Sequence, residues 1–113
     1  MVIALVAMVL LGISPAYSTY EESTIGGSVS ITGLRTCWLG FLNNTVGHNV
    51  DFNNNRTAVV EPTGPDGNEV AGNWIGGNLN CARNLPAAQI GDSGLPLNVV
   101  ERHATGQCAR LKA

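Results

Sequence analysis

The amino-acid sequence predicts an all-β protein built as a small parallel β-helix, or β-solenoid, of about four coils. A short sequence unit recurs along the chain, and a period of about 20–30 residues is typical of solenoid folds. The 113 residues include 14 Gly and 12 Asn, which are residues of tight turns. Beyond Ser18, no stretch places good helix formers at helical apolar spacing, so no helix is expected there.

The repeated unit occupies residues 25–31, 46–52 and 75–81, so successive units start 46 − 25 = 21 and 75 − 46 = 29 residues apart. In each unit, a Gly-containing bend precedes three residues that alternate apolar, polar, apolar, the pattern of a short half-buried strand. Asn recurs just before the strand and is expected to stack on its equivalents in neighbouring coils. Partial echoes at 70–74 and at Val99-Val100 extend the repeat towards the C-terminus.

Two segments are expected to leave the coils. Residues 61–68 are dense in Pro and Gly and supply the 29 − 21 = 8 extra residues of the longer spacing. Residues 84–96 form the second excursion. The alternative fold is an antiparallel β-sandwich with Gly-rich turns, which also fits the composition. A sandwich does not require the same unit in each segment, so the solenoid is favoured.

The N-terminus carries an uninterrupted apolar run over residues 2–13. Its length matches the core of a signal peptide, about 7–15 residues, and is short of the roughly 20 that span a membrane. Small residues place a cleavage site after Ala16 or after Ser18, and Ser18 is slightly favoured. No charged residue precedes the run, which departs from the usual pattern, and a buried strand or helix is the alternative. The sequence predicts a signal peptide over 1–18.

One β-solenoid domain is therefore expected over 19–113, without a membrane span once the signal peptide is removed. The predicted location is secreted, either extracellular or at the cell surface. About 95 residues at roughly 22 per coil give the estimate of four coils.

The 3 Cys favour a disulfide, because the compartment outside the membrane is oxidising. Three single pairs are possible. The favoured pair is Cys81 with Cys108, since both lie in the Gly-, Asn- and Pro-rich final third, where a bridge would clamp a long excursion. Cys37 lies in the apolar stretch 37–42 and is expected to be a small buried hydrophobe. That stretch is expected to help close the N-terminal side of the solenoid.

The charge pattern excludes several classes of partner. Only 12% of residues are charged, and Lys+Arg number 6 against Asp+Glu 8 without a basic cluster, so no nucleic-acid partner is expected. Zinc is not expected, because there is no C-x-x-C and His48 and His103 stand apart. Three acids around the loop are weak calcium candidates, with solvated turn residues as the alternative: Glu61, Asp66 and Glu69. No metal or cofactor is predicted.

Residues 91–94, Gly-Asp-Ser-Gly, resemble the sequence around the nucleophile of trypsin-like proteases. That chemistry needs a His base oriented by an Asp, and neither His48 nor His103 has a recognisable context. We interpret the motif as a turn and predict no catalytic residues. Trp38 and Trp74 are interpreted as packing residues, and an aromatic platform for a glycan is the alternative.

The C-terminal third resembles a group of secreted actinobacterial proteins of largely unassigned function. The residues that carry the resemblance follow the pattern I-G-G-N-L-x-C, a Pro-containing loop, N-x-V and G-Q-C, found here at 75–81, 84–94, 98–100 and 106–108. The resemblance covers most of the chain from Ile25 to Leu111. It implies a right-handed parallel β-helix in which Cys81 and Cys108 pair, and it implies no catalytic residues.

These features predict a secreted, non-enzymatic β-helix protein with a structural or surface-binding role in the cell envelope. A cell-envelope glycan or a surface protein is the expected partner. The alternative is a carbohydrate-binding or polysaccharide-active β-helix module, which rests on analogy with other β-helix proteins.

Overall fold

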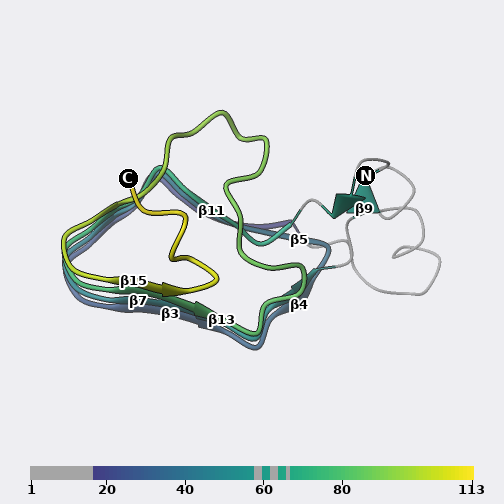
Figure 1. Cartoon of the computed structure of the whole chain (residues 1–113), viewed down its shortest axis with the longest axis horizontal. Helices are drawn as coiled ribbons and strands as arrows, with labels where there is room; N and C mark the ends of the chain where they lie inside the picture. The colour runs from purple at the N-terminus through teal and green to yellow at the C-terminus, as the bar shows by residue number, and fades with distance from the viewer. Residues whose placement is uncertain (1–16, 58–59, 62–63, 66) are drawn as a thin grey trace.

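The computed structural model describes residues 17–57, 60–61, 64–65 and 67–113. Within these residues the chain is all-β without a helix, and its strands stack as a right-handed parallel β-solenoid (Figure 1). The predicted fold class is confirmed, and the antiparallel sandwich is not adopted. Three turns are complete, and a fourth adds strands to only two of the sheets, so the solenoid is slightly shorter than the four coils expected.

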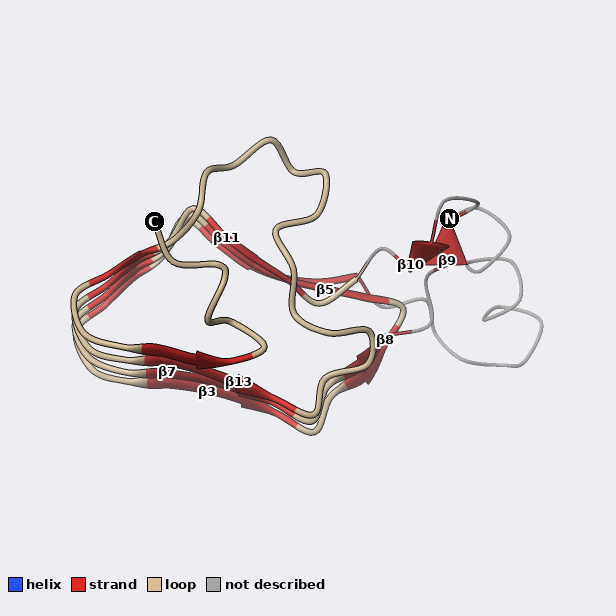
Figure 2. Ribbon diagram, viewed as in Figure 1, coloured by secondary structure: helices blue, strands red, loops and turns tan. Residues whose placement is uncertain are grey.

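The coils have four sides, here named A to D in chain order (Figure 2). Side A consists of β1 (Tyr17–Glu21), β5 (Trp38–Leu42) and β11 (Glu69–Ala71). Side B consists of β2 (Thr24–Ile25), β6 (Thr45–Val46), β12 (Trp74–Ile75) and β14 (Val99–Val100). Side C consists of β3 (Val29–Thr32), β7 (Val50–Asn53), β13 (Leu79–Ala82) and β15 (Ala104–Gly106). Side D consists of β4 (Arg35–Thr36) and β8 (Arg56–Thr57), which Leu85 joins through an isolated bridge.

The strand register reproduces the sequence repeat. Ile25 pairs with Val46, Val46 with Ile75, and Ile75 with Val100. These pairs reproduce the spacings of 21 and 29 and add a third of 100 − 75 = 25. The repeat predicted from sequence is therefore confirmed, including the echo at Val99-Val100.

The core is a single column of apolar side chains inside the coils. Alternation along each strand turns every second side chain inward, as in any β-strand. Phe41, Phe52, Ile75 and Leu79 each have an exposed fraction of 1% or less. Burial of this column supplies the main stabilisation of so small a domain.

A buried Asn ladder runs along the corner between sides A and B. It is formed by Asn44, Asn73 and Asn98, whose exposed fractions are 0–2%. The Oδ1 atom of Asn73 accepts hydrogen bonds from the backbone N–H of Asn44 at 2.8 Å and from its Nδ2 at 3.1 Å. The Nδ2 of Asn73 donates to the carbonyl of Phe41 at 2.9 Å and to Oδ1 of Asn98 at 2.8 Å. Each side chain thus satisfies backbone groups that the corner removes from the sheets.

A second ladder runs along the corner between sides C and D. Oδ1 of Asn84 accepts from the backbone N–H and the Nδ2 of Asn55, and Gln107 continues the column beyond Asn84. The expected stacking of Asn on its equivalents is therefore confirmed. A third column of Ser28, Asn49, Asn78 and His103 lies at the exposed corner between sides B and C.

Glycine is required where successive coils touch at the corner after side B. A Cβ atom on Gly76 would collide with the carbonyl oxygen of Gly47, and one on Gly47 with that of Gly26. Gly26 itself, in the first coil, has nothing within 4 Å of its Cβ position. Close stacking of the backbone therefore selects Gly at the second and third coils but not at the first.

The C-terminal end of the solenoid is closed by the chain itself. A disulfide joins Cys81 of β13 to Cys108, as the sequence predicted. Leu111 is buried, and its carbonyl accepts hydrogen bonds from the backbone N–H and the Nδ2 of Asn98. Figure 1 shows this segment, in yellow, folded across the last coil. The tail therefore covers the core and ends the first ladder.

The predicted closure of the other end is wrong. The stretch 37–42 forms β5, which lies between β1 and β11 in the interior of side A and covers neither end. Cys37 is buried and has a free thiol, as expected.

The first excursion lies where the sequence placed it. Thr36 pairs with Thr57, 21 residues on, whereas Gly40 pairs with Glu69, 29 residues on, so the eight extra residues fall between β8 and β11. The described part of this loop includes a small antiparallel pair, β9 (Val60–Glu61) and β10 (Gly64–Pro65). The second excursion starts later than expected, because Asn84 belongs to a ladder and Leu85 to side D.

Candidate functional site

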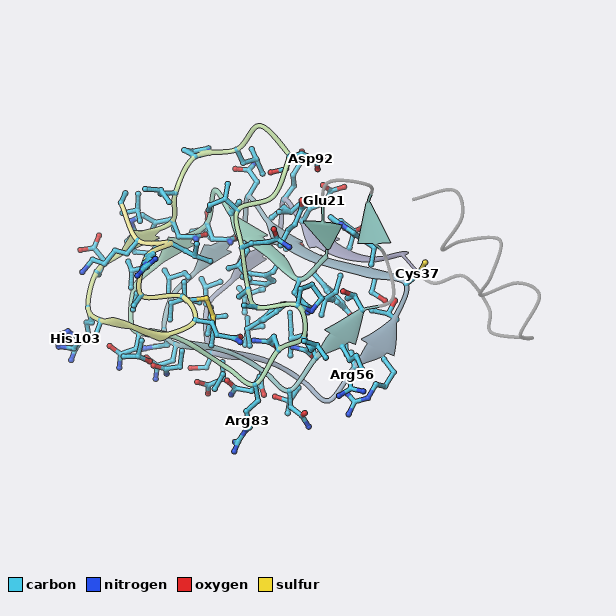
Figure 3. The ribbon with its side chains drawn as sticks, turned by 45° about the vertical axis from the view of Figure 1, so that its right-hand side comes forward. Glu21, Cys37, Arg56, Arg83, Asp92 and His103 are labelled. Carbon is cyan, nitrogen blue, oxygen red and sulfur yellow. A yellow bond between two sulfur atoms is a disulfide. The ribbon has the colours of Figure 1, made fainter. Side chains whose placement is uncertain are left out.

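The Gly-Asp-Ser-Gly motif lies in the second excursion, where residues 91–93 form a turn and bend. Figure 3 shows Asp92 and His103 on opposite sides of the molecule. His48 lies at the same corner as His103, because its carbonyl accepts from Gly77, whose own carbonyl accepts from Arg102. The structure therefore brings neither histidine to Ser93. The interpretation of the motif as a turn is confirmed.

The proposed calcium ligands do not converge in the part of the chain that can be described. Glu69 is 1% exposed and lies beneath the second excursion, where its Oε1 accepts a hydrogen bond from the backbone N–H of Asp92 at 3.0 Å. It is therefore neither a solvated turn residue nor open to a metal ion. Asp66 and the side chain of Glu61 lie outside the described residues. Among the described residues, no group of three His, Cys, Asp or Glu is placed to hold a metal.

Both tryptophans lie on outer faces of the solenoid. Trp74 is 41% exposed, so the interpretation of it as a packing residue is wrong. Its ring lies over Gly76, because a Cβ atom there would be 3.3 Å from the Cη2 atom of the indole. Trp38 is half-buried on side A and covers Gly40 in the same way. In both cases the indole lies over a glycine two residues later, where no side chain stands in its way.

Trp74 belongs to an outward column on side B that we call the Trp74 face. The column consists of Thr24, Thr45, Trp74 and Val99, which are register partners across four coils and are all exposed. It contains two hydroxyl groups, one indole and no charge. A flat parallel sheet presents these groups in one row, with neighbours separated by the spacing of adjacent strands, about 4.8 Å.

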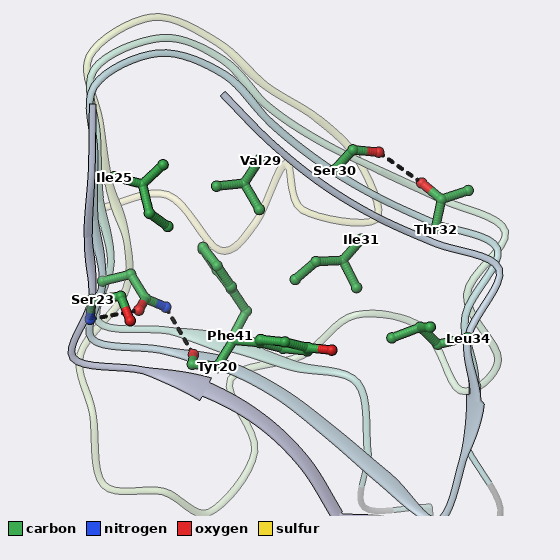
Figure 4. Close-up of a pocket in the computed structure, with 10 residues that line it drawn as sticks. Tyr20, Ser23, Ile25, Val29, Ser30, Ile31, Thr32, Leu34 and Phe41 are labelled. Carbon is green, nitrogen blue, oxygen red and sulfur yellow. Dashed lines mark hydrogen bonds between the residues drawn. The ribbon is translucent and has the colours of Figure 1, made fainter. Parts of the chain in front are cut away.

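The N-terminal end of the solenoid holds a pocket of about 310 Å³ (Figure 4). Its walls come from β1, β2 and β3, and its floor is Phe41 of the second coil. Ile25, Val29 and Leu34 line it and are only partly buried, whereas their equivalents deeper in the stack are fully buried or belong to a ladder. We call this surface the open end. It exists because no described segment folds across the first coil as the tail folds across the last.

Sequence reasoning missed both surfaces, although a signal for each was present. Ile75 is inward in the repeat, so alternation places Trp74 outward. At the ladder positions, the first coil has Ser23 and Leu34 in place of Asn44 and Asn55. That loss of Asn marks the coil where both ladders end.

No family model, no curated protein and no solved structure matches this chain. The functional argument therefore rests on the fold and on the chemistry of its surfaces. Among the described residues, no helix is long and apolar enough to cross a membrane.

Proposed function

We propose that the chain is a secreted, non-enzymatic β-helix protein with a structural or surface-binding role in the cell envelope. Export is supported by the apolar run at 2–13, which has the length of a signal-peptide core. The disulfide between Cys81 and Cys108 is consistent with an oxidising compartment. The rigid outer faces of the solenoid provide the binding surface.

The Trp74 face is the observation that carries the binding role. An exposed Trp held flat on a sheet costs little entropy when it binds a ligand, because glycine and register already fix its position. A ligand that stacks on the indole also lies within reach of the Thr45 hydroxyl in the adjacent strand. This combination of an aromatic face and neutral hydroxyls suits a sugar ring, which has an apolar C–H face and polar edges. A cell-envelope glycan is therefore the ligand class that this surface favours.

The first test is retention of the exported protein on the cells that make it. We expect the wild-type protein to remain with the envelope fraction and Trp74→Ala to be released into the medium. Leu85→Ala is a matched control, because Leu85 is 57% exposed but lies on side D. Equal retention of all three proteins would exclude the Trp74 face as the binding surface.

The second test separates a glycan from a protein ligand. A glycan array probed with the purified exported protein is expected to give signals that Trp74→Ala loses and Leu85→Ala keeps. If retention on cells depends on Trp74 but no glycan binds, the ligand is a surface protein.

The signal-peptide cleavage site is open to the same preparation. β1 begins at Tyr17, and Tyr17 and Ser18 pair with Trp38 and Leu39. Cleavage after Ala16 keeps this strand whole, whereas cleavage after Ser18 removes two of its five residues. The strand therefore favours the Ala16 site over the Ser18 site that the sequence slightly favours. N-terminal sequencing distinguishes a mature protein that starts at Tyr17 from one that starts at Thr19.

A further inference from the structure

The open end is a sheet edge that the first coil leaves without protection. β1, β2, β3 and β4 are each the terminal strand of their sheet. Exposed edges of this kind pair with other chains unless Lys, Pro, a bulge or a covering segment prevents it. Residues 17–37 contain neither Lys nor Pro. The edge surrounds an apolar pocket, so contact with a second surface would bury both.

Charges at the open end are arranged on two sides of the pocket. Glu21 and Glu22 lie at the corner between β1 and β2, and Arg35 lies in β4 on side D. All three are exposed. Figure 3 shows Glu21 and Arg56, the register partner of Arg35, on different sides of the coil. An acidic corner, an apolar centre and a basic side therefore follow one another across this end.

We propose that the open ends of two copies of this chain pair about a two-fold axis to form an end-to-end dimer. A two-fold axis that crosses the end between the acidic corner and Arg35 exchanges the two, so that each copy's Glu21 and Glu22 face the other's Arg35. Such an interface is isologous, because the same patch serves both copies. It also places the two apolar pockets against each other, which removes the exposed part of Ile25, Val29 and Leu34 from water.

The closed C-terminal end limits this assembly to two copies. Head-to-tail stacking would need an open edge at the last coil, and that edge is covered by the segment from Cys108 to Leu111. The backbone N–H and Nδ2 of Asn98 are already bonded to the Leu111 carbonyl, so the ladder offers no donor to a following coil. Two copies joined at their open ends therefore form a closed dimer and not a filament.

The dimer rests on the proposed export in one respect. Removal of the signal peptide leaves nothing of this chain ahead of β1 that could cover the pocket. The dimer would carry two Trp74 faces and bind an envelope surface bivalently, which strengthens binding without a new contact.

The test is sedimentation velocity on the exported protein, together with charge-reversed variants. The wild-type protein is expected to sediment at twice the monomer mass. Arg35→Glu, and separately the double variant Glu21→Arg with Glu22→Arg, are each expected to weaken self-association at least about tenfold, because like charges then meet. An equimolar mixture of the two variants is expected to restore a dimer, since opposite charges meet again at both contacts.

Arg110→Glu is the matched control, because Arg110 is exposed on the closed end and its reversal is expected to leave the dimer intact. Circular dichroism checks that every variant is folded. A monomeric wild-type protein at about 100 μM, well above the Kd of a typical specific dimer, would overturn the proposal. Dimers that ignore the charge reversals, or folded variants that fail to associate when mixed, would also overturn it. None of these results bears on export or on binding at Trp74, so the two proposals fail separately.

Discussion

Replacement of Asn73 by Ala tests how much the buried ladder contributes to stability. Asn73 is 1% exposed and makes four side-chain hydrogen bonds to the coils on either side. The variant leaves the backbone N–H of Asn44 and the carbonyl of Phe41 without this partner inside the protein. Each such group costs about 1–3 kcal/mol when it is buried and unpaired. We expect a loss of about 3–5 kcal/mol in the free energy of unfolding.

The control for this variant is Asn78→Ala, in the same coil. Oδ1 of Asn78 accepts a hydrogen bond from the backbone N–H of His103 at 3.0 Å, in an exposed setting. Water can replace that bond, so the expected loss is about 1 kcal/mol or less. Both variants place Ala at a ladder position, and they differ mainly in the burial of the groups left behind.

Urea unfolding followed by tryptophan fluorescence and circular dichroism measures both free energies, with the disulfide intact. The dependence of the free energy on urea concentration is expected to stay unchanged, because the surface exposed on unfolding is the same. Losses within about 1 kcal/mol of each other would refute the reasoning, since burial would then make no difference to the cost.

Three further predictions follow from features of the coil. Gly76→Ala is expected to cost about 2 kcal/mol or more in the same unfolding assay, because its Cβ meets the Gly47 carbonyl, whereas Gly26→Ala is expected to change stability by no more than about 0.5 kcal/mol. A large loss at Gly26 would contradict the close-contact argument. Replacement of both Cys81 and Cys108 by Ser is expected to cost about 3–4 kcal/mol, as estimated for a loop of 27 residues. Mass spectrometry of non-reduced peptides is expected to find the Cys81–Cys108 link, and a Cys37 link would contradict the structure.

Much of the fold could be predicted because the repeat is a direct record of stacking. Residues that pair across coils share an environment, so Ile25, Val46, Ile75 and Val100 share a β-branched aliphatic type, and their spacing predicts the register. The disulfide followed from its position in the C-terminal third. The two loops were found because extra residues between repeats must leave the coil.

The features that escaped prediction depend on which surface faces water. Buried Asn residues contradict the usual rule that polar side chains lie outside, so the ladder of Asn44, Asn73 and Asn98 was not singled out, although its spacing follows the repeat. Trp74 was assigned to packing because large aromatics dominate burial in small cores. The open end could not be predicted, since the periodicity of a repeat carries no information about which end a terminal segment covers.

The register of the coils has a consequence for how such a chain can evolve in length. Residues 46–74 contribute one full turn, and both Asn ladders pass through that turn with the same contacts on either side. A tandem duplication of this segment would add a coil without altering the disulfide-fastened tail or the first strands. Solenoids tolerate such changes because each unit contacts only its neighbours. The length of this protein is therefore set by its two ends, and the turns between them are interchangeable modules.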